Sequence, residues 1–276
     1  MRVSALFFVL FLVAACAVSP TGRQQLMLVS PEQAIAASKS AYVQTLAPLK
    51  KSGKLDPDPR VSSRIRAISG RIIAQAVRLY PATSEWLWDI RVIDEPDTIN
   101  AWCMAGGKMA IYTGLLNTIV PTDDELAQVI GHEISHAIAH HTAEKMSVAL
   151  ASQIGLSTVA IVAGDSAKSN ATVAGAALAA GLAIQLPNSR RAETEADRIG
   201  IELAARAGYD PRATITLWQK MAEAGGPGTP QFLSTHPDPM NRTATLQSLI
   251  PEMMPYYLQQ YQRPVYTFRQ NTLSLD

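Results

Sequence analysis

Cysteine is scarce in this sequence, which has two, Cys16 and Cys103, in 276 residues. Two cysteines exclude a disulfide-rich scaffold, so stability must come mainly from packing. Aromatic residues make up only 6% of the chain, and the formal net charge is +1. Because a nucleic-acid partner needs a strong basic bias, we expect none here.

A hydrophobic run long enough to span a membrane comfortably is also missing at the N-terminus. Arg2 is followed by an apolar run over 3–13, which is typical of a secretory signal and short for a span. The residues Leu-Val-Ala-Ala-Cys at 12–16 resemble the bacterial lipobox, in which the signal is cut before a cysteine that then carries lipid. We therefore predict a signal peptide over 1–15, lipidation at Cys16 and a lipid-anchored tether over 16–30. The alternative is a plain cleaved signal with Cys16 incidental.

The residue after the lipobox indicates which membrane holds the anchor. Position 17 is Ala and not the Asp that retains bacterial lipoproteins at the inner membrane. The resemblance thus implies the periplasmic face of the outer membrane, with the membrane as a partner through Cys16. An acylated Cys16 would leave no intrachain disulfide.

Hydrophobic periodicity predicts a mainly α-helical protein with one small antiparallel sheet. Helices are expected over 31–49 and 61–79, where apolar residues recur at helical steps. Alternation over 86–93 predicts a strand, and two short segments around Gly106-Gly107 predict a hairpin. The first arm of that hairpin could pair with an extended peptide substrate. Its residues are Asn100, Ala101, Trp102, Cys103 and Met104. A hairpin that only completes the core is an equal alternative.

The segment 147–186 is almost free of charge and rich in small residues. It has two apolar arms, each shorter than the roughly 20 residues that a spanning helix needs. We therefore favour two buried helices over a membrane-inserted hairpin.

The sequence His132-Glu133-Ile134-Ser135-His136 contains the HExxH pattern. Thr122 and Glu125 form a capping box for its helix, which we expect to run to about residue 145. His132 and His136 lie one turn apart and can bind the same ion, while Glu133 lies about 100° round the helix. This pattern is typical of zinc peptidases, in which the glutamate acts as general base, although such spacing can also arise by chance.

The third ligand decides the subclass of such an enzyme. A metzincin needs a glycine and a histidine where this chain has Ala139 and Thr142, so that class is excluded. A gluzincin takes its third ligand from a glutamate on a later helix, and 190–197 begins such a helix. Glu193 and Asp197 share a face of it, so the first could bind zinc and the second could orient a ligand imidazole. An ordinary charged surface helix is the alternative.

Together, HEISH, the apolar segment and Glu-Thr-Glu-Ala-Asp-Arg-Ile-Gly at 193–200 resemble the HtpX and CAAX-prenyl-endopeptidase type of zinc metallopeptidase. The likeness covers about 100–242, and Thr-Gly-Arg at 21–23 after the lipobox is similar to outer-membrane lipoprotein members of the LoiP kind. The resemblance implies a zincin-type fold. It also implies one Zn²⁺ held by His132, His136 and Glu193, with Glu133 as general base.

The resemblance also singles out His236 and Arg242. His236 precedes Pro237 in a His-Pro element, and Arg242 follows. In related proteins such a histidine stabilises the oxyanion or approaches the zinc as a latency switch, and sequence does not choose between these roles. A structural loop histidine is the third reading. His140 and His141 are expected to lie behind the metal ligands or at the surface.

These observations predict a metallopeptidase domain over 31–263 and a C-terminal tail over 264–276. The function we expect is zinc-dependent cleavage of unfolded or misassembled envelope proteins, with the outer-membrane assembly machinery as a candidate partner. The main alternative is a periplasmic assembly factor or chaperone with a latent or structural zinc site. A membrane-embedded protease is a third hypothesis and depends on 147–186.

Overall fold

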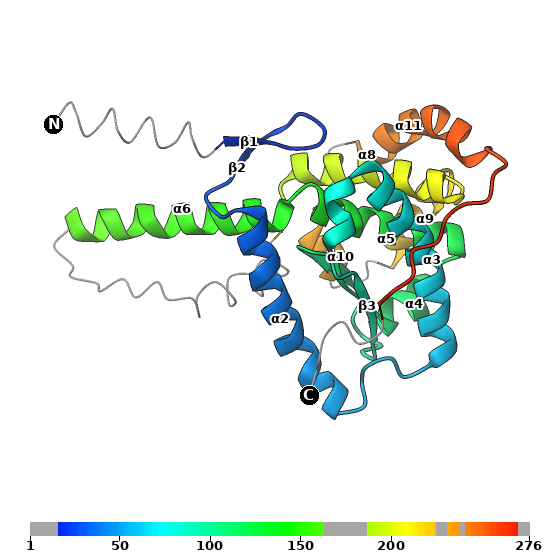
Figure 1. Cartoon of the computed structure of the whole chain (residues 1–276), viewed down its shortest axis with the longest axis horizontal. Coiled ribbons are helices and arrows are strands. Elements are labelled where there is room, and N and C mark those ends of the chain that lie inside the picture. Colours follow the sequence, from blue (N-terminus) through cyan, green and yellow to red (C-terminus); the bar gives the residue numbers. More distant parts are fainter. Residues whose placement is uncertain (1–15, 163–186, 225–230, 238–240, 270–276) are drawn as a thin grey trace.

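Two helices, α5 (Asp123–Ile138) and α8 (Arg190–Ala207), cross at the centre of the fold (Figure 1). This computed structural model describes residues 16–162, 187–224, 231–237 and 241–269. At the crossing, a Cβ on Gly200 would lie 2.8 Å from the backbone nitrogen of His132, and one on Gly131 would lie 2.7 Å from the Gly200 carbonyl oxygen. Only glycine permits this approach, which brings the HExxH helix directly against the helix of Glu193.

Further helices surround this pair. They are α2 (Pro31–Lys51), α3 (Pro59–Leu79), the short 3₁₀ helix η1 (Pro81–Glu85), α4 (Thr113–Ile119), α6 (His141–Val162), α9 (Ala213–Glu223), α10 (Gln231–Thr235) and α11 (Arg242–Tyr257). The amphipathic face of α3 buries Ile65, Ile68 and Ile72 against the core, as its periodicity predicts. The fold is mainly helical, of the zincin metallopeptidase type, as expected.

Local capping determines where the two central helices begin. Thr122 and Glu125 form the predicted capping box at the start of α5, with reciprocal backbone bonds of 3.2 and 2.8 Å. Ser189 accepts a bond from the backbone N–H of Ala192 at the start of α8. Gly208, at φ +87°, ends α8 in the left-handed conformation that glycine adopts readily.

A three-stranded sheet lies beside α5. Its strands are β3 (Asp89–Ile93), β4 (Ala101–Met104) and β5 (Lys108–Tyr112), in the order β3-β5-β4. β4 and β5 form the predicted antiparallel hairpin, whose turn uses positive φ at Gly106 and Gly107. β3 instead pairs parallel with β5, so the sheet is mixed and the predicted antiparallel pairing applies to β4 and β5. Alternation within a strand identifies its faces but carries no information on the direction of its neighbour.

The segment after Cys16 folds where the sequence predicts a tether. β1 (Cys16–Val18) and β2 (Gln24–Leu26) form an antiparallel hairpin, which Gly22 turns at φ +88°. The hairpin lies against the beginning of α6 (Figure 1). Its contacts, described below, reach the central helices.

The helix of the HExxH motif ends earlier than predicted. α5 stops at Ile138, and His140, at φ +57°, separates it from α6. The expected continuous helix to residue 145 was therefore wrong. A non-glycine residue in the left-handed region interrupts the helical hydrogen-bond ladder and redirects the chain, here at His140. The redirected chain places His141 back against the motif.

Several predicted segments lie partly or wholly outside the described residues. They are the signal peptide over 1–15 and the portion 163–186 of the apolar segment. The prediction of two buried helices over a membrane hairpin therefore falls mostly outside the described residues. Among the residues that the structure does describe, no helix is both long and apolar enough to cross a membrane. In the predicted C-terminal tail, the Tyr266 N–H donates to the Gly70 carbonyl at 2.8 Å, and Tyr266 and Phe268 pack on the main core.

Candidate metal centre

Four buried side chains from three parts of the chain converge beside the α5–α8 crossing. His132 and His136 come from α5, Glu193 from α8 and His236 from the segment after α10, and one ligand atom of each lies within 4.8 Å of all the others. The Nε2 atoms of His132 and His136 are 3.0 Å apart. The Glu193 carboxylate lies 3.3 Å from His132 Nε2 and 3.4 Å from His136 Nε2. The structure thus brings together the three ligands that the resemblance implies.

The chemistry of this cluster fits a zinc ion. Imidazole nitrogens and a carboxylate are the donors of catalytic zinc sites, and Glu193 has no exposed surface. A buried carboxylate needs a compensating positive charge. His132, His136 and Glu193 would hold the ion, with His236 within reach as a fourth donor.

Asp197 bonds the Nδ1 side of His132, and Arg242 bonds Asp197. The His132 Nδ1 atom lies 2.9 Å from Asp197 Oδ1, which also accepts a 2.6 Å bond from Arg242. The guanidinium lies 3.5 Å from the centre of the Trp218 ring, and Arg242 is only 3% exposed. Asp197 is therefore placed to accept the Nδ1 proton of His132, which leaves Nε2 for the metal.

The ionisable groups of the cluster influence one another strongly. Burial opposes the charged form of His132, but hydrogen bonds to Asp197 and Glu193 outweigh it and raise the His132 pKa to about 9. Burial lowers the pKa of His136 well below its ordinary value. Although burial alone would raise the pKa of Glu193, the His136 and His236 imidazoles hold it far below the ordinary value. Glu193 is thus ionised, as a ligand must be.

Glu133 lies next to the four donors and has an unusual environment. It is 3% exposed, and its Oε1 atom has no hydrogen-bond partner among the described residues. The Nε2 atom of His236 lies 3.4 Å from this oxygen. Burial raises the pKa of Glu133, which makes the carboxylate a better proton acceptor.

His236 is held in place by its own segment. Its ring stacks on Phe232 at 4.5 Å between centroids, and its backbone N–H donates to the Phe232 carbonyl at 2.9 Å. Its Nδ1 atom lies 3.2 Å from both His132 Nε2 and Glu193 Oε1. His236 therefore faces the metal ligands and is not a histidine of an exposed loop.

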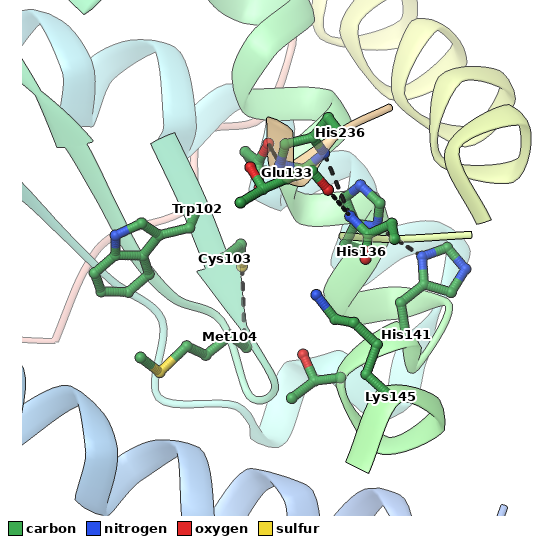
Figure 2. A pocket seen from close by; sticks show the side chains of 11 residues that line it. Trp102, Cys103, Met104, Glu133, His136, His141, Lys145 and His236 are labelled. Carbon is green, nitrogen blue, oxygen red and sulfur yellow. Dashed lines mark hydrogen bonds and ion pairs between the residues drawn. The ribbon is translucent and has the colours of Figure 1, made fainter. Parts of the chain in front are cut away.

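A cavity of about 30 Å³ opens beside Glu133. Figure 2 shows Trp102, Cys103 and Met104 of β4 on one side of it, and Glu133, His136 and Lys145 on the other. Since a water molecule needs at least about 10–15 Å³, the cavity has room for water.

The predicted substrate strand is only partly at this cavity. Trp102, Cys103 and Met104 line it, whereas Asn100 and Ala101 do not. The Asn100 side chain instead accepts a 2.9 Å bond from the Ala101 backbone N–H. Within the described part of the chain β4 pairs with β5 alone, so it is an edge strand of its sheet.

Of the two histidines expected behind the metal ligands or at the surface, His141 lies behind His136, whereas sequence reasoning missed the roles of Glu195 and Lys145. His141 Nδ1 lies 2.7 Å from His136 Nδ1, and Glu195 Oε2 lies 3.1 Å from His141 Nε2. Lys145 lines the cavity, and burial lowers its pKa to about 8. The helix period does turn Glu195 away from the metal, but the structure shows that this direction leads to His141. No spacing rule identifies this contact, because it depends on the break at His140.

The fold and the donor set define a zinc metallopeptidase of the zincin type. More particularly, the chain belongs to peptidase family M48, whose model matches residues 59–250. This confirms the metallopeptidase prediction at the level of the family.

Similar proteins include both mitochondrial and bacterial members. "Metalloendopeptidase OMA1, mitochondrial" of Bos taurus is 35% identical over 90% of this chain and 49% of its own length. "Mitochondrial metalloendopeptidase OMA1" of Arabidopsis thaliana is 39% identical over 58% of this chain and 31% of its own. "Beta-barrel assembly-enhancing protease" of Escherichia coli is 27% identical over 76% of this chain and 43% of its own. The chain thus spans about half the length of these relatives, or less.

The zinc affinity of the metal-free protein should increase with pH between about pH 6 and pH 8. Below its pKa of about 9, His132 carries a proton that zinc must displace, so affinity should rise up to about tenfold per pH unit. Competition with a chromophoric chelator at several pH values measures this. Asp197→Asn should flatten the dependence, because Asp197 is a main cause of the raised pKa. An affinity independent of pH in the unsubstituted protein would contradict the assignment.

Proposed function

We propose that this chain is a zinc-dependent endopeptidase of the bacterial envelope that cleaves unfolded or misassembled proteins. The observation that carries the proposal is the position of Glu133. A buried carboxylate with a raised pKa lies beside the three side chains that would hold zinc, with His236 Nε2 3.4 Å from its Oε1 atom. A purely structural zinc site has no use for such a group.

The chemistry follows from the roles of these side chains. When bound, zinc supplies a Lewis acid that polarises a carbonyl and lowers the pKa of water. Glu133 accepts a proton from the water that attacks the scissile carbonyl and returns it to the leaving nitrogen. Asp197 keeps the His132 ring in the orientation and tautomer that binding requires.

The edge strand β4 supports an extended peptide as substrate. Its residues Trp102, Cys103 and Met104 line the same cavity as Glu133, so a peptide paired with this edge would pass the proton acceptor. An unfolded segment can adopt this extended form, whereas a folded one cannot.

The envelope location rests on sequence features of the N-terminus. The lipobox-like residues before Cys16 and the likeness to LoiP-type lipoproteins support an anchor on the periplasmic face of the outer membrane. The similar Escherichia coli protein is named for β-barrel assembly, which supports envelope proteins as substrates and the outer-membrane assembly machinery as a partner. The mitochondrial relatives are named as metalloendopeptidases, so they support the reaction but not the envelope location.

A second function is favoured by His236. With this residue the cluster offers four protein donors, and four-ligand zinc sites are usually structural. A chaperone or assembly factor with a latent site would look like this. If the protein is a protease, displacement of His236 should expose cleavage activity. If it is an assembly factor, displacement should expose none.

Glu133→Gln should retain zinc and reduce cleavage of an unfolded substrate at least about 100-fold, because the amide cannot accept the proton. Zinc content and cleavage rate are measured on the same preparation. Glu202→Gln, on a partly exposed residue of α8, is the matched control and should leave both unchanged. Full cleavage by a zinc-loaded Glu133→Gln protein would overturn the catalytic role.

His236→Ala should increase the basal cleavage rate several-fold and weaken zinc binding moderately. The substitution removes the fourth donor and one wall of the cavity but leaves His132, His136 and Glu193 in place. A protease assay with a fluorogenic unfolded protein measures the change. A fall in rate with zinc retained would instead assign His236 to oxyanion stabilisation, and no cleavage by either form would favour the assembly factor.

Cys16→Ser should abolish lipid attachment in bacterial cells. The serine side chain lacks the thiol that carries the lipid, so the protein should lose metabolic palmitate label and leave the outer-membrane fraction. Replacement of the other cysteine, Cys103→Ser, serves as the control and should keep the label. A labelled Cys16→Ser protein, or an unlabelled unsubstituted one, would refute the anchor.

A further inference from the structure

A chain of hydrogen bonds leads from the metal ligand His136 to the N-terminal hairpin. His136 Nδ1 lies 2.7 Å from His141 Nδ1, and His141 Nε2 lies 3.1 Å from Glu195 Oε2. Glu195 in turn accepts bonds from three side chains of the hairpin, those of Ser19, Thr21 and Arg23. The zinc mechanism assigns no role to these hydrogen bonds.

The direction of each bond follows from the chemistry of the groups. An ionised carboxylate can only accept, so His141 donates its Nε2 proton to Glu195. In a neutral His141, Nδ1 then carries the lone pair and accepts a proton from His136 Nδ1. This leaves the lone pair of His136 on Nε2, the atom that faces His132 and Glu193. These hydrogen bonds therefore favour the His136 tautomer that can bind metal through Nε2.

The β1–β2 hairpin surrounds Glu195, at the far end of this series of hydrogen bonds. Ser19 and Glu195 are 5% exposed, and Arg23 bonds Glu195 through Nε at 2.7 Å. The remaining nitrogens of Arg23 form a bidentate pair with Glu144 at 2.7 and 2.6 Å. These contacts fix the orientation of the Glu195 carboxylate and balance its charge.

The hairpin also holds the turn that positions His141. The Gln25 side chain donates a 2.7 Å bond to the carbonyl of Ala139, at the end of α5. It also donates to Glu144 at 3.0 Å. Gln25 of the hairpin thus bonds both the end of α5 and the beginning of α6, and so stabilises the break between them.

We propose that His141 and Glu195 are positioning residues for the metal ligand His136, and that the β1–β2 hairpin is an integral part of the metal centre. The proposal rests on the zinc site of the proposed function. The two ligand histidines then have parallel supports, Asp197 directly behind His132 and Glu195 through His141 behind His136. A further consequence is that the segment next to the predicted anchor contributes to metal binding.

The test compares His141→Leu with His141→Gln in the full-length chain. Leucine removes both hydrogen-bonding functions, whereas glutamine retains a donor for Glu195 and an acceptor for His136. We expect His141→Leu to weaken zinc binding about 10–100-fold, as loss of an outer hydrogen bond to a ligand typically does, and His141→Gln to restore most of it. The d–d spectrum of the cobalt-substituted protein should shift in the leucine variant and return towards normal in the glutamine variant.

Glu195→Gln and the double variant Ser19→Ala with Thr21→Val test the outer part of the chain. Both should weaken zinc binding in the same direction, and ¹⁵N NMR of the metal-free protein should show a change in the His136 tautomer. Glu202→Gln on α8 and Gln24→Ala, at an exposed position of the hairpin, are matched controls that should have no effect. Circular dichroism establishes that each variant is folded.

Equal zinc affinity and unchanged cobalt spectra in folded His141→Leu and Glu195→Gln proteins would overturn the proposal. None of these measurements requires cleavage. Loss of the proposed protease function would therefore appear in the Glu133→Gln experiment, and failure of this proposal would appear in metal affinity and tautomer alone.

Discussion

The close approach of α5 and α8 is the constraint on which the rest of the structure depends. Glycines at 131 and 200 allow the two backbones to meet, and any Cβ there would collide with the opposite helix. Helix pairs with ordinary side chains at the contact stay about 8–10 Å apart. The glycines therefore bring the side chains of the two helices within bonding distance. That closeness allows Glu193 to lie between His132 and His136.

Burial gives the acidic residues of α8 their separate tasks. Glu193, Glu195 and Asp197 are all buried, and a buried carboxylate is costly unless it is paired and hydrogen-bonded. Each has a different set of partners. Glu193 faces the metal ligands, Asp197 bonds His132 and Arg242, and Glu195 bonds His141 and the hairpin. Three alternate positions on one helix thus contact three different regions of the fold.

Two further parts of the fold meet the α5–α8 pair at the metal centre. His236 approaches Glu133 and the ligands from a short segment after α10, while β4 lines the same cavity from the sheet. The centre thus depends on four separate stretches of the chain, which only the folded protein brings together.

Much of the fold and the site could be predicted because the signals were local. Capping by Thr122, the turn at Gly106 and Gly107, and the ending of α8 at Gly208 all depend on residues a few positions apart. The same is true of His132, Glu133 and His136, which share one helix. Local hydrogen bonds and helical periodicity therefore determine these features.

The sequence by itself determined the HExxH helix, the order of the main elements and the separation of Glu193 and Asp197 from Glu195 round their helix. Only the tertiary structure decided the direction of β3, which runs parallel to β5. It also decided that His141 contacts His136 and that Glu195 points toward His141. The residues after Cys16 fold against Glu195 in the same way. The physical reason is that these contacts join segments as far apart as Thr21 and Glu195. Their geometry depends on the left-handed break at His140 and on the close crossing of two helices, neither of which any short-range pattern encodes.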